Sequence, residues 1–341
     1  MAWHAIAHGA NAVLYWQWRS ALGGQEQYHG SLIDQSGQPR PFYAEAQVLG
    51  KEIQSVSGLL AGSKIDSRVA LLNSYDSRWS IEFQRHNNDF DYVDHFNHYY
   101  RSLAVRNICV DIISADETLD GYKLVIAPAL IILNEKRVAN LTKFVQNGGH
   151  LILTIRTGMK DEFNSFLPSR QPGALAKLSG VEVEEYYALD QAIPIEGQWL
   201  RGFGQHWAER LALLDQQNAV PISTYGKSNG WLDGHIAIAV HPFGAGLVYT
   251  VGVYLDENAQ QILIDHVLQT AGIQGTLSEK DVEVSTCLDE SGREILIVIN
   301  HSQEERLFAL PWSAFEHLTG QTVHNELKLS PYDVVVLTKK E

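Results

Sequence analysis

The sequence predicts an α/β protein with a doubly wound, parallel sheet at its centre, and three observations lead to this class. Near-continuous apolar runs such as "LVIAPAL" and "HLILTI" are typical of strands buried on both faces. Between residues 67 and 154 such runs alternate with segments of helical periodicity. A helix predicted over 135–147 ends at Gly148-Gly149, where glycine accepts the left-handed backbone that closes a helix. Strands and helices in alternation form a parallel sheet with helices on both faces.

The elements of this central region follow from the same patterns. Apolar runs predict strands and helical spacing predicts helices at these positions: strands 69–72, 108–113, 124–127 and 150–154, and helices 92–105, 135–147 and 257–271. The glycines of "HPFGAGLVYTVG" predict a hairpin. The segment 189–231, rich in Trp and Gly, gives no clear pattern.

The two ends of the chain differ from the centre. The start predicts a helix over 3–8, a strand over 12–18 and, after a loop, a helix over 41–57, which cannot close a core alone. From residue 276, strands around an Asp-Glu-Ser-Gly turn and a last strand in "YDVVVL" predict a small antiparallel β-domain, a β-sandwich. We therefore expect domains at 1–62, 63–275 and 276–341.

Charge and composition exclude several classes of partner. The formal net charge of −14, from 40 acidic and 26 basic side chains, argues against binding to nucleic acid or anionic lipid. No apolar run reaches the roughly 18 residues of a membrane span, and no signal peptide is recognised, which favours a cytoplasmic setting. Cys109 and Cys287 form no CxxC pair, so both are predicted to be small buried side chains rather than zinc ligands or a disulfide.

The stretch "WQWRSALGGQEQYHG" at residues 16–30 has the composition of a sugar site. Aromatic rings stack on sugar faces, while carboxylate and imidazole groups hold the hydroxyls, and Trp16, Glu26 and His29 supply such groups. The alternative is structural, with Trp16 and Trp18 in a core and Glu26 and His29 in solvent.

Resemblance to a known family favours the first interpretation. "HAIAHGANAVLYWQWRSALGGQEQYHG", followed by "GQPRPFYAEAQVLGKEI", resembles the last strand, loop and helix of the catalytic (β/α)8 barrel in glycoside hydrolase family 42, the bacterial β-galactosidases. In that family the corresponding aromatic, Glu and His residues help to hold galactose. The resemblance thus implies substrate-binding roles for Trp16, Glu26 and His29, and makes residues 1–62 a remnant of the barrel.

The centre of the chain resembles the same family. "LDGYKLVIAPALIILNEKRVANLTKFVQNGGHLILTIRTGMKDE" is similar to the β-galactosidase trimerisation domain, a flavodoxin-like domain related to class I glutamine amidotransferases. The resemblance implies a homotrimer whose intact form hydrolyses terminal β-D-galactosides with retention. Retaining enzymes need two carboxylates about 5 Å apart, and both of the family's would lie upstream of Met1. The chain alone is therefore expected to be inactive, with no catalytic residue, metal or cofactor assigned to it.

Two other functions stay open at this stage. The chain could be a non-catalytic assembly module that joins a separate chain supplying the rest of the barrel. It could also be an amidotransferase-like hydrolase, but such enzymes place a cysteine on a sharp turn between strand and helix. The loop after strand 150–154 reads "IRTGMKDE", without cysteine.

Two further expectations concern single segments. "HNNDFDYVDHFNHYY" collects Asp89, Asp91, Asp94, His95 and His98, for which we favour helix capping and solvation over a metal site. Residues 1–60 would leave an apolar strand edge uncovered, so this segment is predicted to be disordered, repacked onto the central domain or paired with another copy.

Overall fold

The computed structural model describes residues 1–340. The chain forms two compact units: Ser67–Gly275 makes up one, and residues 1–66 together with 276–340 make up the other. Each unit is described by itself.

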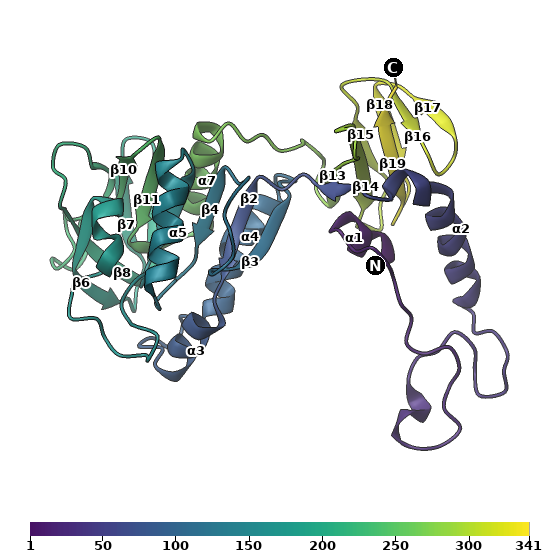
Figure 1. The fold of residues 1–341 in the computed structure, drawn as a ribbon, viewed down its shortest axis with the longest axis horizontal. Coiled ribbons are helices and arrows are strands. Elements are labelled where there is room, and N and C mark those ends of the chain that lie inside the picture. Colours follow the sequence, from purple (N-terminus) through teal and green to yellow (C-terminus); the bar gives the residue numbers. More distant parts are fainter. Residues whose placement is uncertain (341) are drawn as a thin grey trace. The chain divides into compact units, whose positions relative to one another are not determined.

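The central unit is built on an eleven-stranded mixed sheet (Figure 1). Five neighbouring strands run parallel in the order β3-β2-β4-β5-β11. Their bounds are β2 Val69–Asn73, β3 Val110–Ser114, β4 Leu124–Ala127, β5 His150–Thr154 and β11 Gly246–Val251. The predicted strands of this part are confirmed, with differences of one or two residues at β2 and β3.

The other half of this sheet is antiparallel. The predicted sheet was entirely parallel and did not include these strands. Its strands are β6 Val181–Ala188, β7 Ile193–Gly197, β8 Gly202–Leu213, β9 Val220–Tyr225, β10 Ile236–Phe243 and β12 Val253–Leu255. The hairpin predicted from the glycines is present, because β10 pairs with β11 across a short turn. The segment 189–231 supplies β7, β8 and β9, and β8 shows no regular alternation of buried and exposed residues that would have revealed it.

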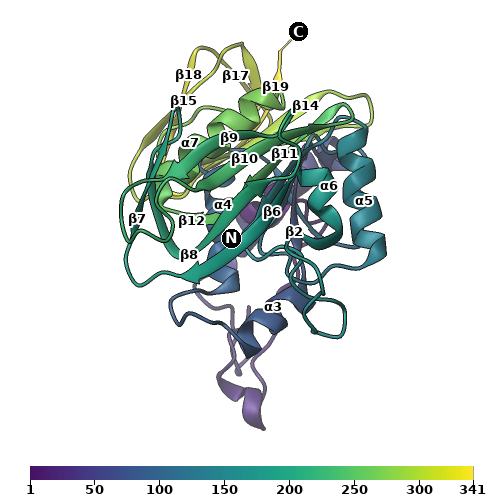
Figure 2. The same cartoon turned by 90° about the vertical axis from the view of Figure 1, so that its left-hand side faces the viewer.

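Helices cover both faces of the central sheet (Figure 2). They are α3 Tyr75–Phe83, α4 Tyr92–Ala104, α5 Glu135–Gln146, α6 Ala176–Ser179 and α7 Glu257–Thr270, with a 3₁₀ turn, η2 Gly173–Leu175. One core contains Tyr99 of α4 and Leu263 of α7, and the core of the opposite face contains Phe144 of α5 and Leu178 of α6. The prediction of a sheet wound on both faces is therefore correct for this unit.

The second unit contains a six-stranded antiparallel sheet in the order β1-β13-β14-β19-β16-β17, and a ribbon of β15 and β18. The bounds are β1 Lys64–Ile65, β13 Val282–Leu288, β14 Glu294–Asn300, β15 Arg306–Ala309, β16 Ala314–Glu316, β17 Gln321–Val323, β18 Glu326–Leu329 and β19 Val334–Lys339. Side chains alternate between two cores, so that Leu296 and Val298 meet the ribbon while Ile295 and Ile297 face the other way. Both faces of this sheet thus pack against other elements of the unit.

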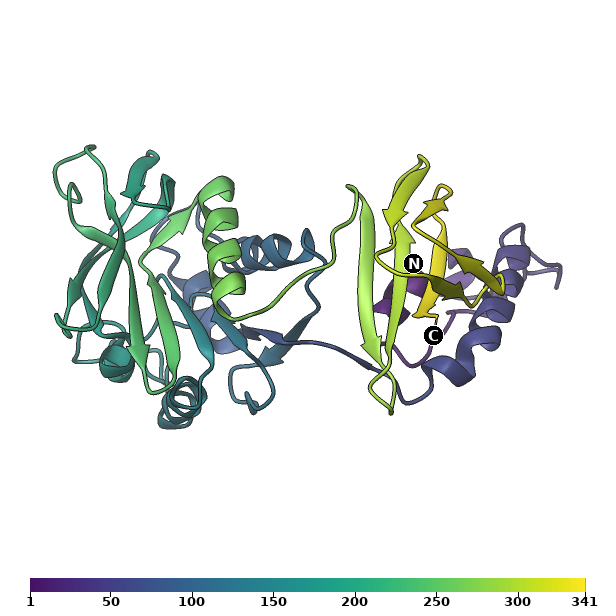
Figure 3. The same cartoon turned by 90° about the horizontal axis from the view of Figure 1, so that it is seen from above.

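The face of this six-stranded sheet that carries Ile295 and Ile297 is covered by the start of the chain (Figure 3). Helices α1 Ala2–Ala7 and α2 Tyr43–Leu60 bring Trp3, Ala7 and Val56 into a common core with β14. Strand β1 adds to the edge of β13. The predicted repacking onto the central domain is therefore wrong, because the apolar side chains of α1 and α2 find their partners on the C-terminal sheet.

The strand expected over residues 12–18 is absent from the described residues. This stretch belongs to a long loop between α1 and α2, which Figure 1 shows in purple, with one 3₁₀ turn, η1 Gln25–Tyr28. A barrel strand is held by hydrogen bonds to strands on both sides. No strand of residues 1–340 lies beside 12–18, so the apolar pattern alone does not produce the extended ladder.

The two cysteines differ in their surroundings. Cys287 is buried, as predicted, whereas Cys109 is only half-buried. Cys109 precedes β3, the last strand at its edge of the sheet, and this position explains its exposure. Within residues 1–340 no helix combines the length and apolar character needed to cross a bilayer.

Candidate functional site

The loop between α1 and α2 carries the three residues predicted to bind a sugar. Gln17 N donates to Gly30 O (3.2 Å), Leu32 N donates to Gln17 O (3.1 Å), and Ile33 N donates to Trp18 O (2.9 Å). These bonds align the two arms of the loop side by side. The backbone of Trp16 therefore lies next to the arm that carries His29.

All three side chains are exposed. Trp16 is 75% accessible, and Glu26 and His29 lie at the surface on η1 and directly after it. The amide of His29 donates to Glu26 O at 3.1 Å, which fixes the spacing of these two residues. No hydrogen bond or ring contact joins the three side chains in the part of the chain that the structure describes. The structural alternative is wrong in placing Trp16 and Trp18 in a core, since Trp18 is also 58% accessible, but its placement of Glu26 and His29 in solvent agrees with their exposure.

A buried polar cluster holds the base of the loop. Ser20 and Ser31 are 4% and 2% accessible, and their hydroxyl oxygens are 2.7 Å apart. Arg40 donates to both, from Nη2 to Ser20 Oγ at 2.9 Å and from Nε to Ser31 Oγ at 3.2 Å. Sequence reasoning missed this cluster, because two serines and an arginine in a polar loop give no signal of burial.

Replacing Arg40 by alanine should loosen the loop without unfolding the unit. The two buried hydroxyls then lose their hydrogen bonds from a charged group, and each such bond contributes at most about 1.5–3 kcal/mol to stability. We expect the amides of Leu32 and Ile33 to exchange with solvent at least about tenfold faster, because 1.4 kcal/mol corresponds to a factor of ten. Hydrogen exchange measured by NMR checks this, with Lys51→Ala on the exposed surface of α2 as the control. Equal exchange rates in the two variants would contradict the role assigned to Arg40.

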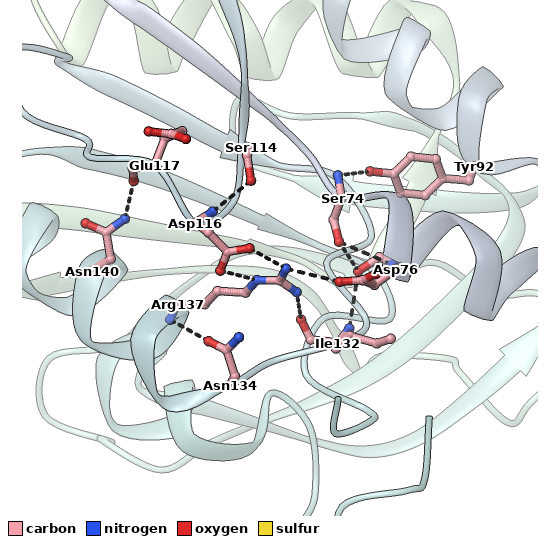
Figure 4. Close-up of polar contacts among 11 residues, drawn as sticks. Ser74, Asp76, Tyr92, Ser114, Asp116, Glu117, Ile132, Asn134, Arg137 and Asn140 are labelled. Carbon is pink, nitrogen blue, oxygen red and sulfur yellow. Dashed lines mark hydrogen bonds and ion pairs between the residues drawn. The ribbon is translucent and has the colours of Figure 1, made fainter. Parts of the chain in front are cut away.

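The carboxyl ends of the parallel strands form the edge where doubly wound sheets bind their ligands. Here that edge is occupied by Arg137, which is 5% accessible (Figure 4). Its guanidinium donates to both carboxylate oxygens of Asp116 (2.9 and 2.7 Å), to Asp76 (3.4 Å) and to Ile132 O (3.1 Å). The hydrogen bond from Arg137 lowers the pKa of Asp116. The hydrogen-bonding groups of these residues pair with one another, so the cluster fastens the first turn of α3 to the loops after β3 and β4.

The loop after β5 is the place where an amidotransferase would carry its nucleophile. The structure places Arg156 there, at a φ of 66°. Its guanidinium lies over the rings of Trp207 (4.6 Å) and Phe90 (5.4 Å), and burial lowers its pKa to about 10. An arginine packed in this way offers no nucleophile, and the amidotransferase alternative gains no support.

The histidines considered for a metal site have other partners. His95 is buried, its Nε2 lies 3.0 Å from Thr154 Oγ1, and burial lowers its pKa to about 3. His98 stacks on Tyr254 at 5.2 Å. Asp91 accepts from the amides of Val93 and Asp94, which confirms helix capping. A cluster of potential metal ligands lies elsewhere in the described residues, at His4, Glu283 and His301, and sequence reasoning missed it because these residues come from opposite ends of the chain.

Comparison with family models gives three matches along the chain. Residues 67–274 match the β-galactosidase trimerisation domain, residues 1–56 match a model described as β-galactosidase, and residues 278–339 match the β-galactosidase C-terminal domain. All three models describe parts of one class of glycoside hydrolase.

Curated relatives and solved structures agree with this class. β-Galactosidase LacZ of Lactobacillus acidophilus is 29% identical over 98% of this chain and 50% of its own length. β-Galactosidase BgaH of Haloferax lucentense is 34% identical over 81% of this chain and 40% of its own length. The crystal structure of a β-galactosidase from Bacillus circulans sp. alkalophilus superposes with a TM-score of 0.92 at 26% identity, over 99% of this chain and 51% of that one.

The chain belongs to the β-galactosidases of glycoside hydrolase family 42. It spans about half the length of the curated relatives that it matches.

Proposed function

We propose that this chain supplies one side of the galactose-binding pocket of a β-galactosidase, through Trp16, Glu26 and His29, and that its central unit is the oligomerisation domain. The observation that carries the proposal is the loop between α1 and α2. It presents these three side chains to solvent, none of them bonded to another, in the region that matches the β-galactosidase model.

The chemistry of the three side chains suits a sugar. An indole ring offers a flat apolar surface for the sugar face, while a carboxylate accepts and an imidazole donates or accepts hydrogen bonds from hydroxyls. The exposed large apolar side chains of the same loop include Leu14, Leu22 and Tyr28. Such a concentration of exposed apolar residues is typical of a surface that another part of a protein covers. This supports a pocket completed by barrel strands that residues 1–340 do not contain.

Glu26 is proposed as a substrate ligand rather than a catalytic residue. Retention requires a second carboxylate about 5 Å away. The other carboxylate of the loop, Asp34, accepts from Ser36 N (2.8 Å) and Gln38 N (2.9 Å) and thus stabilises a turn. Both catalytic carboxylates are therefore proposed to lie outside this chain, and the whole protein would hydrolyse terminal β-D-galactosides with retention.

The central unit is proposed to be flavodoxin-like and to assemble as a trimer. The strand order β3-β2-β4-β5-β11 supports the flavodoxin-like fold. When these five strands are renumbered 1 to 5 along the chain, their order in the sheet is 2-1-3-4-5, which is the order typical of flavodoxin-like sheets. The match of residues 67–274 to a trimerisation domain supports the assembly.

Two measurements on the purified chain test this function together. With a chromogenic β-galactoside we expect no turnover, and in solution we expect a mass three times the 38.1 kDa of one chain. Turnover by the chain alone would contradict the absence of the catalytic carboxylates. A monomeric mass would contradict the oligomerisation role.

The pocket itself is tested by restoring the rest of the barrel. The half of the Lactobacillus acidophilus relative that this chain does not match is co-expressed with this chain, and turnover of the chromogenic galactoside is measured. If activity returns, Trp16→Ala should raise KM about tenfold, because one aromatic contact contributes up to about 1.4 kcal/mol of binding free energy. Glu26→Gln should raise KM as well. Glu45→Gln, on the exposed side of α2, is the control and should leave KM unchanged. Equal KM values in all variants would exclude these residues from the pocket.

A further inference from the structure

A cluster of three imidazoles and one carboxylate lies where α1 meets the C-terminal sheet. Glu283 on β13 is at its centre. His8 Nε2 is 2.6 Å from Glu283 Oε1, His301 Nε2 is 2.6 Å from Oε2, and His4 Nε2 is 3.5 Å from Oε2. The rings also touch edge to face, with centroids 4.6 Å apart for His4 and His8 and 5.4 Å apart for His4 and His301.

Regular secondary structure explains why the four side chains converge. Glu283 alternates with Val282 and Val284, which face the other core, so its carboxylate points toward α1. His4 and His8 are four residues apart and therefore share one side of the helical turn. His301 is held beside β13 because its amide donates to Asp281 O at 2.8 Å.

The two oxygens of Glu283 have different neighbours. Oε2 faces His4 and His301, and the ligand atoms of these three residues all lie within 4.8 Å of one another. Oε1 faces His8, at 2.6 Å from its Nε2. Among the described residues, the side-chain partners of Glu283 are imidazoles, and no lysine or arginine pairs with this carboxylate.

This arrangement resembles a metal site with an outer partner. Two imidazoles and a carboxylate suit a borderline divalent ion such as Zn²⁺ better than Mg²⁺ or Ca²⁺, which prefer oxygen ligands. Ligand atoms of a tetrahedral zinc ion are about 3.3 Å apart, as follows from bonds of about 2.0 Å, so only small side-chain movements are needed. A pocket of about 390 Å³ borders His4 and His301 and gives an ion and a water molecule access.

We propose that His4, Glu283 and His301 bind one Zn²⁺ ion, and that His8 orients the carboxylate by binding its other oxygen. The ion links α1 to the C-terminal sheet, and a water molecule completes its four ligands. The site is independent of the galactose pocket, since the loop that carries Trp16, Glu26 and His29 contributes no ligand.

Calorimetric titration with ZnCl₂ of the full chain, first stripped with a chelator, tests the site. We expect one Zn²⁺ per chain and a higher melting temperature of this unit when the ion is bound. Loss of an outer partner typically weakens metal binding about 10- to 100-fold, so His8→Ala should fall in this range. His4→Ala and His301→Ala remove direct ligands and should weaken binding more than His8→Ala does. Titration with CoCl₂ should give the visible absorption bands of a four-coordinate ion.

His324→Ala is the control, because His324 is an exposed histidine of the same unit outside the cluster. It should bind Zn²⁺ like the unmodified chain. His4 is the decisive position, since its side chain is 53% accessible and its replacement leaves the core intact. Zn²⁺ binding by His4→Ala with unchanged affinity, or no Zn²⁺ uptake by the unmodified chain, would overturn the proposal.

Discussion

Replacement of Arg137 by alanine should lower the free energy of unfolding of the central unit by about 3 kcal/mol. Loss of one partner from a buried ion pair costs about 3–5 kcal/mol, and the lower figure applies because the side chains of Asp116 and Asp76 are 34% and 57% accessible. For a unit of this size, the melting temperature should fall by about 6–12 °C. Differential scanning calorimetry of the full chain measures it.

Arg170→Ala is the matched control in the same unit. Arg170 pairs with Glu182 at 2.6 Å, but its side chain is 56% accessible, so its loss should cost less than about 1 kcal/mol. Arg137→Lys keeps the charge but not the two-pronged contact with Asp116, and we expect a melting temperature between those of the other two variants. Equal melting temperatures for Arg137→Ala and Arg170→Ala would show that the buried cluster does not fasten the strand ends.

The second large effect concerns Glu209, a buried carboxylate in the same unit. Glu209 Oε1 accepts from Arg156 N (2.6 Å) and Trp207 Nε1 (3.1 Å), yet burial raises the pKa of Glu209 to about 7. Between its ordinary value of 4.5 and about 7, the folded chain retains a proton that the unfolded chain has lost. The free energy of unfolding therefore falls as pH rises through this window, by about 3 kcal/mol at most.

Glu209→Gln should remove this dependence, because glutamine keeps an oxygen acceptor and does not ionise. The difference in stability between Glu209→Gln and the unmodified chain should grow in favour of glutamine from pH 5 to pH 8, as measured by urea unfolding. His95, whose pKa is lowered to about 3, weakens both proteins alike as pH falls below 6.5 and cancels in this difference. Glu162→Gln in an exposed loop is the control. Parallel curves of unfolding free energy against pH for Glu209→Gln and the unmodified chain would refute a raised pKa of Glu209.

The predictable part of the fold consists of elements whose own residues decide their structure. Strands β4 and β5 have the predicted limits because continuous apolar runs require burial on both faces, and α5 begins where predicted because Asn134 caps it. Strand β8 depends instead on pairing with its neighbours, because its residues show no regular alternation of buried and exposed positions. Residues 12–18 show the converse case, in which a strand-like pattern lacks neighbours to pair with.

The same distinction holds for the candidate sites. Trp16, Glu26 and His29 lie within one short stretch, so composition and family resemblance could single them out. The Ser20, Ser31 and Arg40 cluster and the His4, Glu283 and His301 cluster consist of residues that only the folded backbone brings together. Their chemistry could be recognised once the structure showed which side chains face one another.

The unit formed by residues 1–66 and 276–340 is interrupted by the whole of Ser67–Gly275. During synthesis α1, α2 and β1 leave the ribosome long before the strands that cover their apolar sides. The central unit is complete first and can fold while the ends are still unpaired, because domains fold as units in the order of synthesis. Contacts between Trp3 and β14 then close a loop that contains an already folded body. Assembly of the terminal unit is thus expected to follow folding of the central unit, and the apolar side of α1 around Trp3 stays uncovered until then.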